Sequence, residues 1–68
     1  MEFPSSAAEK LLKRTGLRVS DEAVTEFTGL LEEIASDLAA EADANAKSLR
    51  RRTIKPDDIE AAKRALLG

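Results

Sequence analysis

Apolar residues recur at helical spacing through the middle of the chain. Placed at about 100° per residue, the apolar positions from Val24 to Leu49 fall within an arc of roughly 160°, and most acidic residues fall opposite them. No proline interrupts this stretch. Ser20 followed by Asp21 is typical of a helix N-terminus, because a serine side chain can accept a hydrogen bond from the first turn. The pattern therefore predicts one amphipathic helix of roughly 28 residues that begins after Ser20.

Two shorter helices are predicted on either side of the long one. Ser6 and Glu9 fit a capping box, and the helix that they begin is expected to end at Gly16, a residue suited to a helix C-cap. Pro56 suits the first position of a third helix, since proline is tolerated where the backbone N–H is unpaired. A short extended link lies on each side of the long helix. The expected fold is an all-α single domain, residues 1–68, in the order short helix, long helix, short helix.

The long helix also predicts a second chain. A 28-residue helix is about 42 Å long, whereas a compact globule of 68 residues spans only about 28 Å. The two short helices are too small to cover its apolar stripe, and an exposed strip of this size indicates association. We therefore expect an obligate dimer whose long helices cross, with a core of large apolar side chains from the long helix: Phe27, Leu30, Leu31, Ile34 and Leu38.

The composition excludes several classes of function. The 68 residues include no cysteine, histidine, tryptophan or tyrosine, so the chain has no disulfide, no thiolate metal site and no histidine base. No glycine-rich phosphate loop, nucleophile–base pair or metal cluster is present, and we expect no enzyme activity, cofactor, metal or small-molecule substrate. No apolar run approaches the ~20 residues of a membrane span, and the N-terminus lacks the features of a signal peptide. A soluble intracellular protein is the expectation.

Charge is segregated along the chain. Eleven basic and thirteen acidic residues give a net charge of −2, which taken alone argues against a nucleic-acid ligand. Residues 10–18, the first basic cluster, carry +4, and residues 47–55, the second basic cluster, carry +5. Residues 20–46 between them carry −8. The placement of the basic residues, and not their sum, therefore decides whether the chain can bind nucleic acid.

Four segments together resemble the tailless archaeal-type histones. Residues 1–4 (MEFP) resemble a Met-Glu-Leu-Pro start, residues 18–21 (RVSD) the first link and helix start, and residues 31–35 (LEEIA) the central helix. Residues 51–59 (RRTIKPDDI) resemble the Arg-Lys-Thr-Ile-Lys-x-x-Asp-Ile motif, the most specific of the four. The resemblance covers nearly the whole chain. It implies a histone fold in which two chains clasp head to tail in a handshake dimer.

The resemblance also implies a DNA-binding surface. In that family the first link of one chain lies beside the second link of its partner, and the dimer bends duplex DNA over its convex face. Arg18 resembles an arginine that enters the minor groove and reads its width. Arg51 and Asp58 resemble a pair that clamps the second link onto the third helix, a structural role that we favour for Arg51 over DNA contact. The full set of implied DNA-binding residues is Lys10, Lys13, Arg14, Arg18, Arg51, Arg52, Thr53 and Lys55.

The end of the long helix departs from the family pattern. Asn45 and Ser48 stand where the family uses a leucine and a histidine in a contact between dimers, and Leu49-Arg50 replaces the usual Ala-Gly. Asn45 also lies inside the apolar arc. Two interpretations of this candidate dimer–dimer interface (Asn45, Ser48 and Leu49) are open. Either the contact is weakened, leaving a dimer or a tetramer built through another surface, or Asn45 pairs across a symmetry axis as a buried specificity contact.

The expected function is binding and bending or compaction of double-stranded DNA with little sequence specificity, by a homodimer or tetramer. Such a protein would lie in the cytoplasm, on the chromosome or nucleoid of a prokaryote. Affinity would come from phosphate contacts made by the paired links. The alternative is a histone-fold module for protein interaction or heterodimerisation, which the excess of acids favours, although that excess also fits adaptation to high salt. Membrane-surface binding is disfavoured because the polar face of the long helix is acidic.

Overall fold

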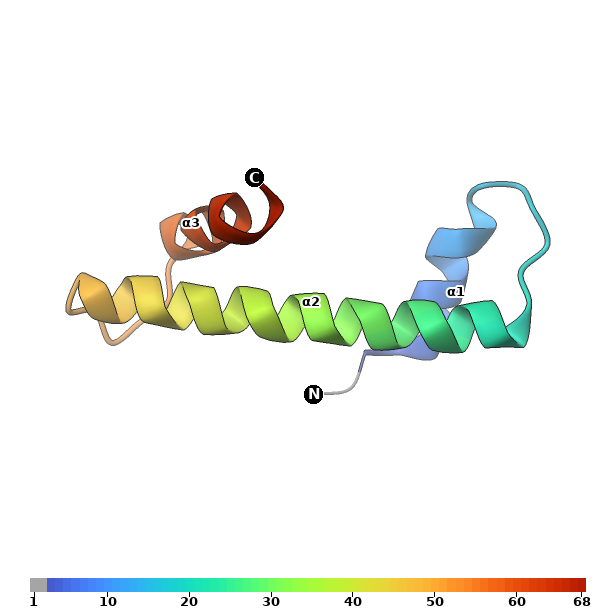
Figure 1. Cartoon of the computed structure of the whole chain (residues 1–68), viewed down its shortest axis with the longest axis horizontal. Coiled ribbons are helices and arrows are strands. Elements are labelled where there is room, and N and C mark those ends of the chain that lie inside the picture. The colour runs from blue at the N-terminus through green and yellow to red at the C-terminus, as the bar shows by residue number, and fades with distance from the viewer. Residues whose placement is uncertain (1–2) are drawn as a thin grey trace. The chain divides into compact units, whose positions relative to one another are not determined.

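The computed structural model describes residues 3–68, which form three helices and no strand. They are α1 (Ser5–Lys13), α2 (Asp21–Ser48) and α3 (Pro56–Leu67), in chain order (Figure 1). The predicted all-α class and the order short, long, short are confirmed. Met1 and Glu2, the first two residues of the N-terminal motif, lie outside the described residues.

The long helix begins where the sequence predicts. Ser20 precedes α2, and its Oγ accepts a hydrogen bond from the backbone N–H of Ala23 at 3.1 Å. Asp21 and Glu22 occupy the first turn, where negative charge interacts favourably with the helix dipole. The helix runs for 28 residues without a break.

The start of α1 differs from the prediction. The helix begins at Ser5 with Pro4 as its N-cap, no side chain caps it, and the predicted capping box of Ser6 and Glu9 is wrong. The reason is that Pro4 holds an extended backbone (φ −63°, ψ 122°), which places Ser6 inside the first turn and not ahead of it. Glu9 forms an ion pair with Lys13 instead, at 3.2 Å.

The prediction that Gly16 ends and caps α1 is wrong, because the helix already ends at Lys13 with Arg14 as its C-cap. The helix ends at Lys13, and the N–H of Gly16 donates to the Lys13 carbonyl at 3.1 Å. Gly16 has a φ of +87°, a conformation that glycine adopts without steric cost. The glycine therefore turns the chain just after the helix, two residues beyond the C-cap Arg14.

The chain divides into two compact units, residues 1–34 and 35–68, and α2 contributes to both. In the first unit Ala8 of α1 is fully buried. The backbone N–H of Phe3 donates to the Glu32 carboxylate on α2 at 2.8 Å. In the second unit Ala42 and Ala46 of α2 and Ala62 of α3 are buried, together with one carboxylate, that of Asp58.

The core of a single chain is very small. Its buried apolar residues are four alanines, and none of the large side chains predicted for the dimer core is buried. Leu30 is 50% exposed, and Phe27, Leu31, Ile34 and Leu38 are partly exposed. A single chain thus leaves much of its apolar surface uncovered.

The C-terminus of α2 ends in a Schellman motif. The N–H of Arg51 donates to the Ala46 carbonyl and the N–H of Arg50 to the Lys47 carbonyl, both at 2.9 Å. This motif requires a left-handed residue, which here is Arg50 with a φ of +57°. Glycine usually occupies this position, because a Cβ in the left-handed region costs roughly 1 kcal/mol.

We predict that Arg50→Gly stabilises the protein. The expected gain in the free energy of unfolding is about 0.5–1 kcal/mol per chain, because glycine removes the left-handed strain. Urea denaturation followed by circular dichroism measures it. Arg50→Ala, which keeps a Cβ, is the control and should give no such gain. An Arg50→Gly variant no more stable than the parent would contradict the strain assigned to this position.

Candidate nucleic-acid interface

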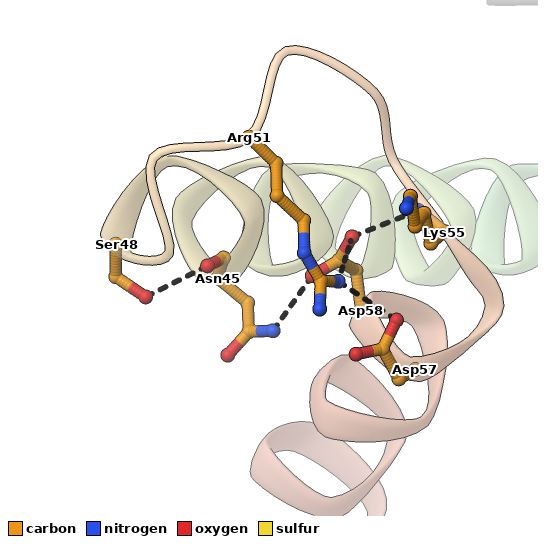
Figure 2. Close-up of polar contacts among 6 residues, drawn as sticks. All are labelled: Asn45, Ser48, Arg51, Lys55, Asp57 and Asp58. Carbon is orange, nitrogen blue, oxygen red and sulfur yellow. Dashed lines mark hydrogen bonds and ion pairs between the residues drawn. The ribbon is translucent and has the colours of Figure 1, made fainter.

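A buried carboxylate organises the second link, residues 49–55. Asp58 lies in the first turn of α3 and is 0% exposed. One of its oxygens, Oδ2, accepts a hydrogen bond from the backbone N–H of Lys55 at 2.8 Å. The other, Oδ1, accepts from the side-chain amide of Asn45 on α2, also at 2.8 Å (Figure 2). One side chain therefore joins the end of the link to both helices of the second unit.

The structure brings Arg51 and Asp58 together. Arg51 Nη1 lies 3.3 Å from each carboxylate oxygen of Asp58 and 2.8 Å from Oδ1 of Asp57 (Figure 2). The Arg51 side chain is 28% exposed, whereas that of Asp57 is 60% exposed. Among residues 3–68, no buried side-chain polar atom lacks a hydrogen-bond partner. The burial of Asp58 is therefore accompanied by full hydrogen bonding, which such a group requires.

The network also fixes the charge state of its members. The hydrogen bond from the Lys55 N–H is the main cause of a lowered pKa for Asp58, assisted by the Asn45 amide and the charge of Arg51. The hydrogen bond from Arg51 lowers the pKa of Asp57. In return, the hydrogen bond to Asp57 raises the pKa of Arg51. All three groups are therefore charged at neutral pH.

Two of the contacts here were not anticipated from the sequence. Asn45 is half-buried and donates to Asp58 of its own chain, and the Ser48 hydroxyl donates to the Asn45 carbonyl at 2.7 Å. A polar residue inside the apolar arc indicated that Asn45 needs a partner. The identity of that partner depends on how α3 packs against α2, which no local pattern encodes.

The other polar side chains predicted on the second link face solvent. Arg52, Thr53 and Lys55 are exposed, and within residues 3–68 none of their side chains forms an ion pair. Lys55 uses its backbone N–H for Asp58 and leaves its ammonium group free. Arg51 is thus engaged within the fold, whereas the side chains of Arg52, Thr53 and Lys55 are exposed.

The residues predicted in the first basic cluster belong to the first unit. Lys10 and Lys13 lie on α1, Arg14 is its C-cap, and Arg18 lies in the link before α2. All four are exposed. The ion pair with Glu9 compensates part of the charge of Lys13. Within one chain the two basic clusters therefore belong to separate units.

The order of short, long and short helices fits the histone fold. Residues 1–62 match the family described as histone-like transcription factor (CBF/NF-Y) and archaeal histone, and the chain belongs to this family. It is similar to the protein named "Probable archaeal histone 3" of Methanocaldococcus jannaschii, with 39% identity over 64 residues. That alignment covers 93% of this chain and 96% of the archaeal protein.

A viral protein is a second relative. A histone doublet of Melbournevirus is 39% identical over 61 residues, which cover 88% of this chain. The chain spans only 36% of the length of that viral protein.

The described part of the chain contains neither a membrane-spanning helix nor a metal-binding cluster. No helix in residues 3–68 is long and apolar enough to cross a membrane. The same residues contain no group of three or more acidic side chains placed to hold a metal ion.

The lowered pKa of Asp58 predicts an acid-sensitive link. A carboxylate whose pKa is lower in the folded state stabilises the fold above its unfolded pKa of about 3.9, and this stabilisation is lost as pH falls through the folded value. Asp58→Asn should therefore be less stable than the parent at pH 6, and the difference should shrink below about pH 4.

The measurement is the urea midpoint of both proteins between pH 6 and pH 2.5. Asp57→Asn is the matched control, because Asp57 pairs with the same Arg51 but its side chain is 60% exposed. At pH 6, Asp57→Asn should lower the urea midpoint less than Asp58→Asn does. A gap between parent and Asp58→Asn that stays constant down to pH 2.5 would contradict the assigned ionic role.

Proposed function

We propose that the chain forms a homodimer that binds duplex DNA with little sequence specificity and bends or compacts it. The observation that carries this proposal is the division of roles among the basic side chains of the second link. Its Arg51 is engaged by Asp57 and Asp58, and its remaining basic side chains are exposed without intrachain ion pairs in the described residues. Family membership and the name of the archaeal relative support a non-enzymatic role in DNA packaging on a chromosome.

The small core supports dimerisation. Four buried alanines remove little apolar surface from water, whereas ordering each residue costs about 1–2 kcal/mol of conformational entropy. The large apolar side chains predicted for the dimer core, Leu30 among them at 50% exposure, are all at least partly exposed in the single chain. We infer that the partly exposed apolar side chains of α2 meet a second copy of the chain, and that the two units then form one domain.

Binding in this proposal depends on both basic clusters. A head-to-tail dimer would place the first link of one chain beside the second link of the other. Arg52, Thr53 and Lys55 would contact phosphates, as would Lys10, Lys13 and Arg14 from the first cluster. Arg18 would enter the minor groove. Arg51 would act indirectly, by holding the second link against α3.

The test is the salt dependence of binding to a random 60-base-pair duplex. With about six to ten phosphates neutralised per dimer, log affinity should fall with log salt at a slope of roughly −0.9 per phosphate. Arg18→Ala combined with Arg52→Ala should weaken binding and flatten the slope. Lys63→Ala combined with Arg64→Ala removes the same charge from exposed positions on α3 and is the control. Fluorescence anisotropy measures both quantities.

A flat salt response of the parent protein, or no binding at low salt, would refute the proposed function. Equal binding by the parent and the Arg18/Arg52 variant would support the other class of function, a histone-fold module that pairs with a different protein. The name of the matching family includes transcription factors, so that class is the relevant competitor.

We infer further that assembly stops at the dimer. The side-chain amide of Asn45 is bound to Asp58, and the Ser48 hydroxyl is bound to the Asn45 carbonyl. These groups therefore have their partners within the chain, which leaves Leu49, 53% exposed, as the large apolar side chain of the candidate dimer–dimer interface. A single leucine per chain is a weak basis for stacking dimers.

Sedimentation velocity tests this inference. At low micromolar concentration the parent should sediment as a dimer, and a monomeric folded species would contradict the dimer itself. Asn45→Leu exchanges a half-buried amide for an apolar side chain at this face and should yield larger assemblies. Asn45→Ala is the control, since it also breaks the bond to Asp58 but adds little apolar surface. If both variants remained dimers, Asn45 would not be what limits assembly.

A further inference from the structure

Arg50 adopts a backbone conformation that its side chain disfavours. It is the single non-glycine residue with a positive φ among residues 3–68. The Schellman motif at the end of α2 requires this conformation, and glycine would supply it without strain. Residues held in such strained conformations are often retained for a functional reason. The side chain of Arg50 is therefore the feature to explain.

No contact with the described part of the chain explains the arginine. Its side chain is exposed, and within residues 3–68 it forms no hydrogen bond or ion pair. Its neighbour Arg51 behaves in the opposite way, since its guanidinium is bound by Asp57 and Asp58. The next residue, Arg52, is exposed like Arg50. Two unpaired arginines thus flank the one that is engaged within the fold.

The helix dipole offers an alternative explanation. A cation near a helix C-terminus interacts favourably with the carbonyl groups there. Lys47 already occupies the last turn of α2, where it pairs with Asp43 at 2.9 Å. The two explanations predict opposite effects of Arg50→Gly on stability. If the dipole interaction dominates, the variant is less stable, and if left-handed strain dominates, it is more stable.

We propose that Arg50 is a phosphate-binding residue of the second link, additional to Arg52, Thr53 and Lys55. A guanidinium can bind two phosphate oxygens at once. Because the Arg50 guanidinium has no ion pair in residues 3–68, it can bind a phosphate without first breaking a bond within the chain. The proposal rests on the proposed DNA-binding function and names a further contact of that same surface. Each homodimer would gain two phosphate contacts from this position.

The experiment compares four proteins on the random 60-base-pair duplex: the parent, Arg50→Gly, Arg50→Asn and Arg50→Lys. Glycine and asparagine both tolerate the left-handed conformation and remove the charge. Each lost contact should weaken binding about eightfold at 0.1 M salt, and two lost contacts should reduce the slope of log affinity against log salt by about 1.8. Arg50→Lys should keep the slope of the parent.

Stability separates this effect from unfolding. Arg50→Gly should unfold at a higher urea concentration than the parent while binding DNA more weakly, which damage to the fold cannot produce. Arg64→Asn, on an exposed position of α3, removes the same charge and should leave the slope unchanged. Equal losses in Arg64→Asn and Arg50→Asn would indicate a general charge effect and overturn the assignment of Arg50.

The two proposals fail in different ways. Suppose that the parent binds DNA with a steep salt slope, and that Arg50→Gly and Arg50→Asn bind as tightly as the parent. The assignment of Arg50 is then wrong and the DNA-binding function stands. If Arg50→Gly is less stable than the parent and binds DNA normally, Arg50 serves the dipole of α2. If the parent does not bind duplex DNA at all, the proposed function itself fails.

Discussion

The burial of one charge, the carboxylate of Asp58, constrains how the segments of the second unit come together. Removing a carboxylate from water is unfavourable unless hydrogen bonds and an opposite charge replace the solvent. Asp58 obtains these from Lys55 in the link, Asn45 on α2 and Arg51 at the start of the link. These partners come from α2 and from two positions along the link, so the carboxylate is satisfied only when α2, the link and α3 are all in place. The conformation of the link is thereby coupled to the packing of the helices, and Arg51 is used for structure while its neighbours stay free.

The helices were largely predictable from the sequence because their signals are local. Apolar periodicity identified α2, and Ser20 and Pro56 marked the starts of α2 and α3 at the residues where the structure has them. The start of α1 was misplaced because Ser5 and Ser6 are adjacent and both suit an N-cap. Neither serine is the N-cap in the structure, because Pro4 holds an extended backbone and takes the cap position itself.

The candidate site was predictable in its residue types but not in its geometry. The basic clusters were visible in the charge pattern, and the resemblance to archaeal-type histones suggested that Arg51 faces Asp58. Asn45 and Asp58 lie thirteen residues apart along the chain, and the hydrogen bond between them depends on how α3 packs against α2. The left-handed backbone of Arg50 has no glycine to signal it in this chain, and its one indication was that Arg50 stands where the family has a glycine.

The net charge of −2 and a DNA-binding role are compatible because charges act locally in salt. The Debye length is about 10 Å at 0.1 M ionic strength, so exposed charges farther apart than this are largely screened from each other. A phosphate beside the second link would therefore interact mainly with the link's own side chains. In the second basic cluster, Lys47 forms an ion pair with Asp43, and Arg51 forms ion pairs with Asp57 and Asp58. Arg50, Arg52 and Lys55 carry the charge that remains, and the number of such unpaired cations is a better guide to the affinity for a polyanion than the sum over the whole chain.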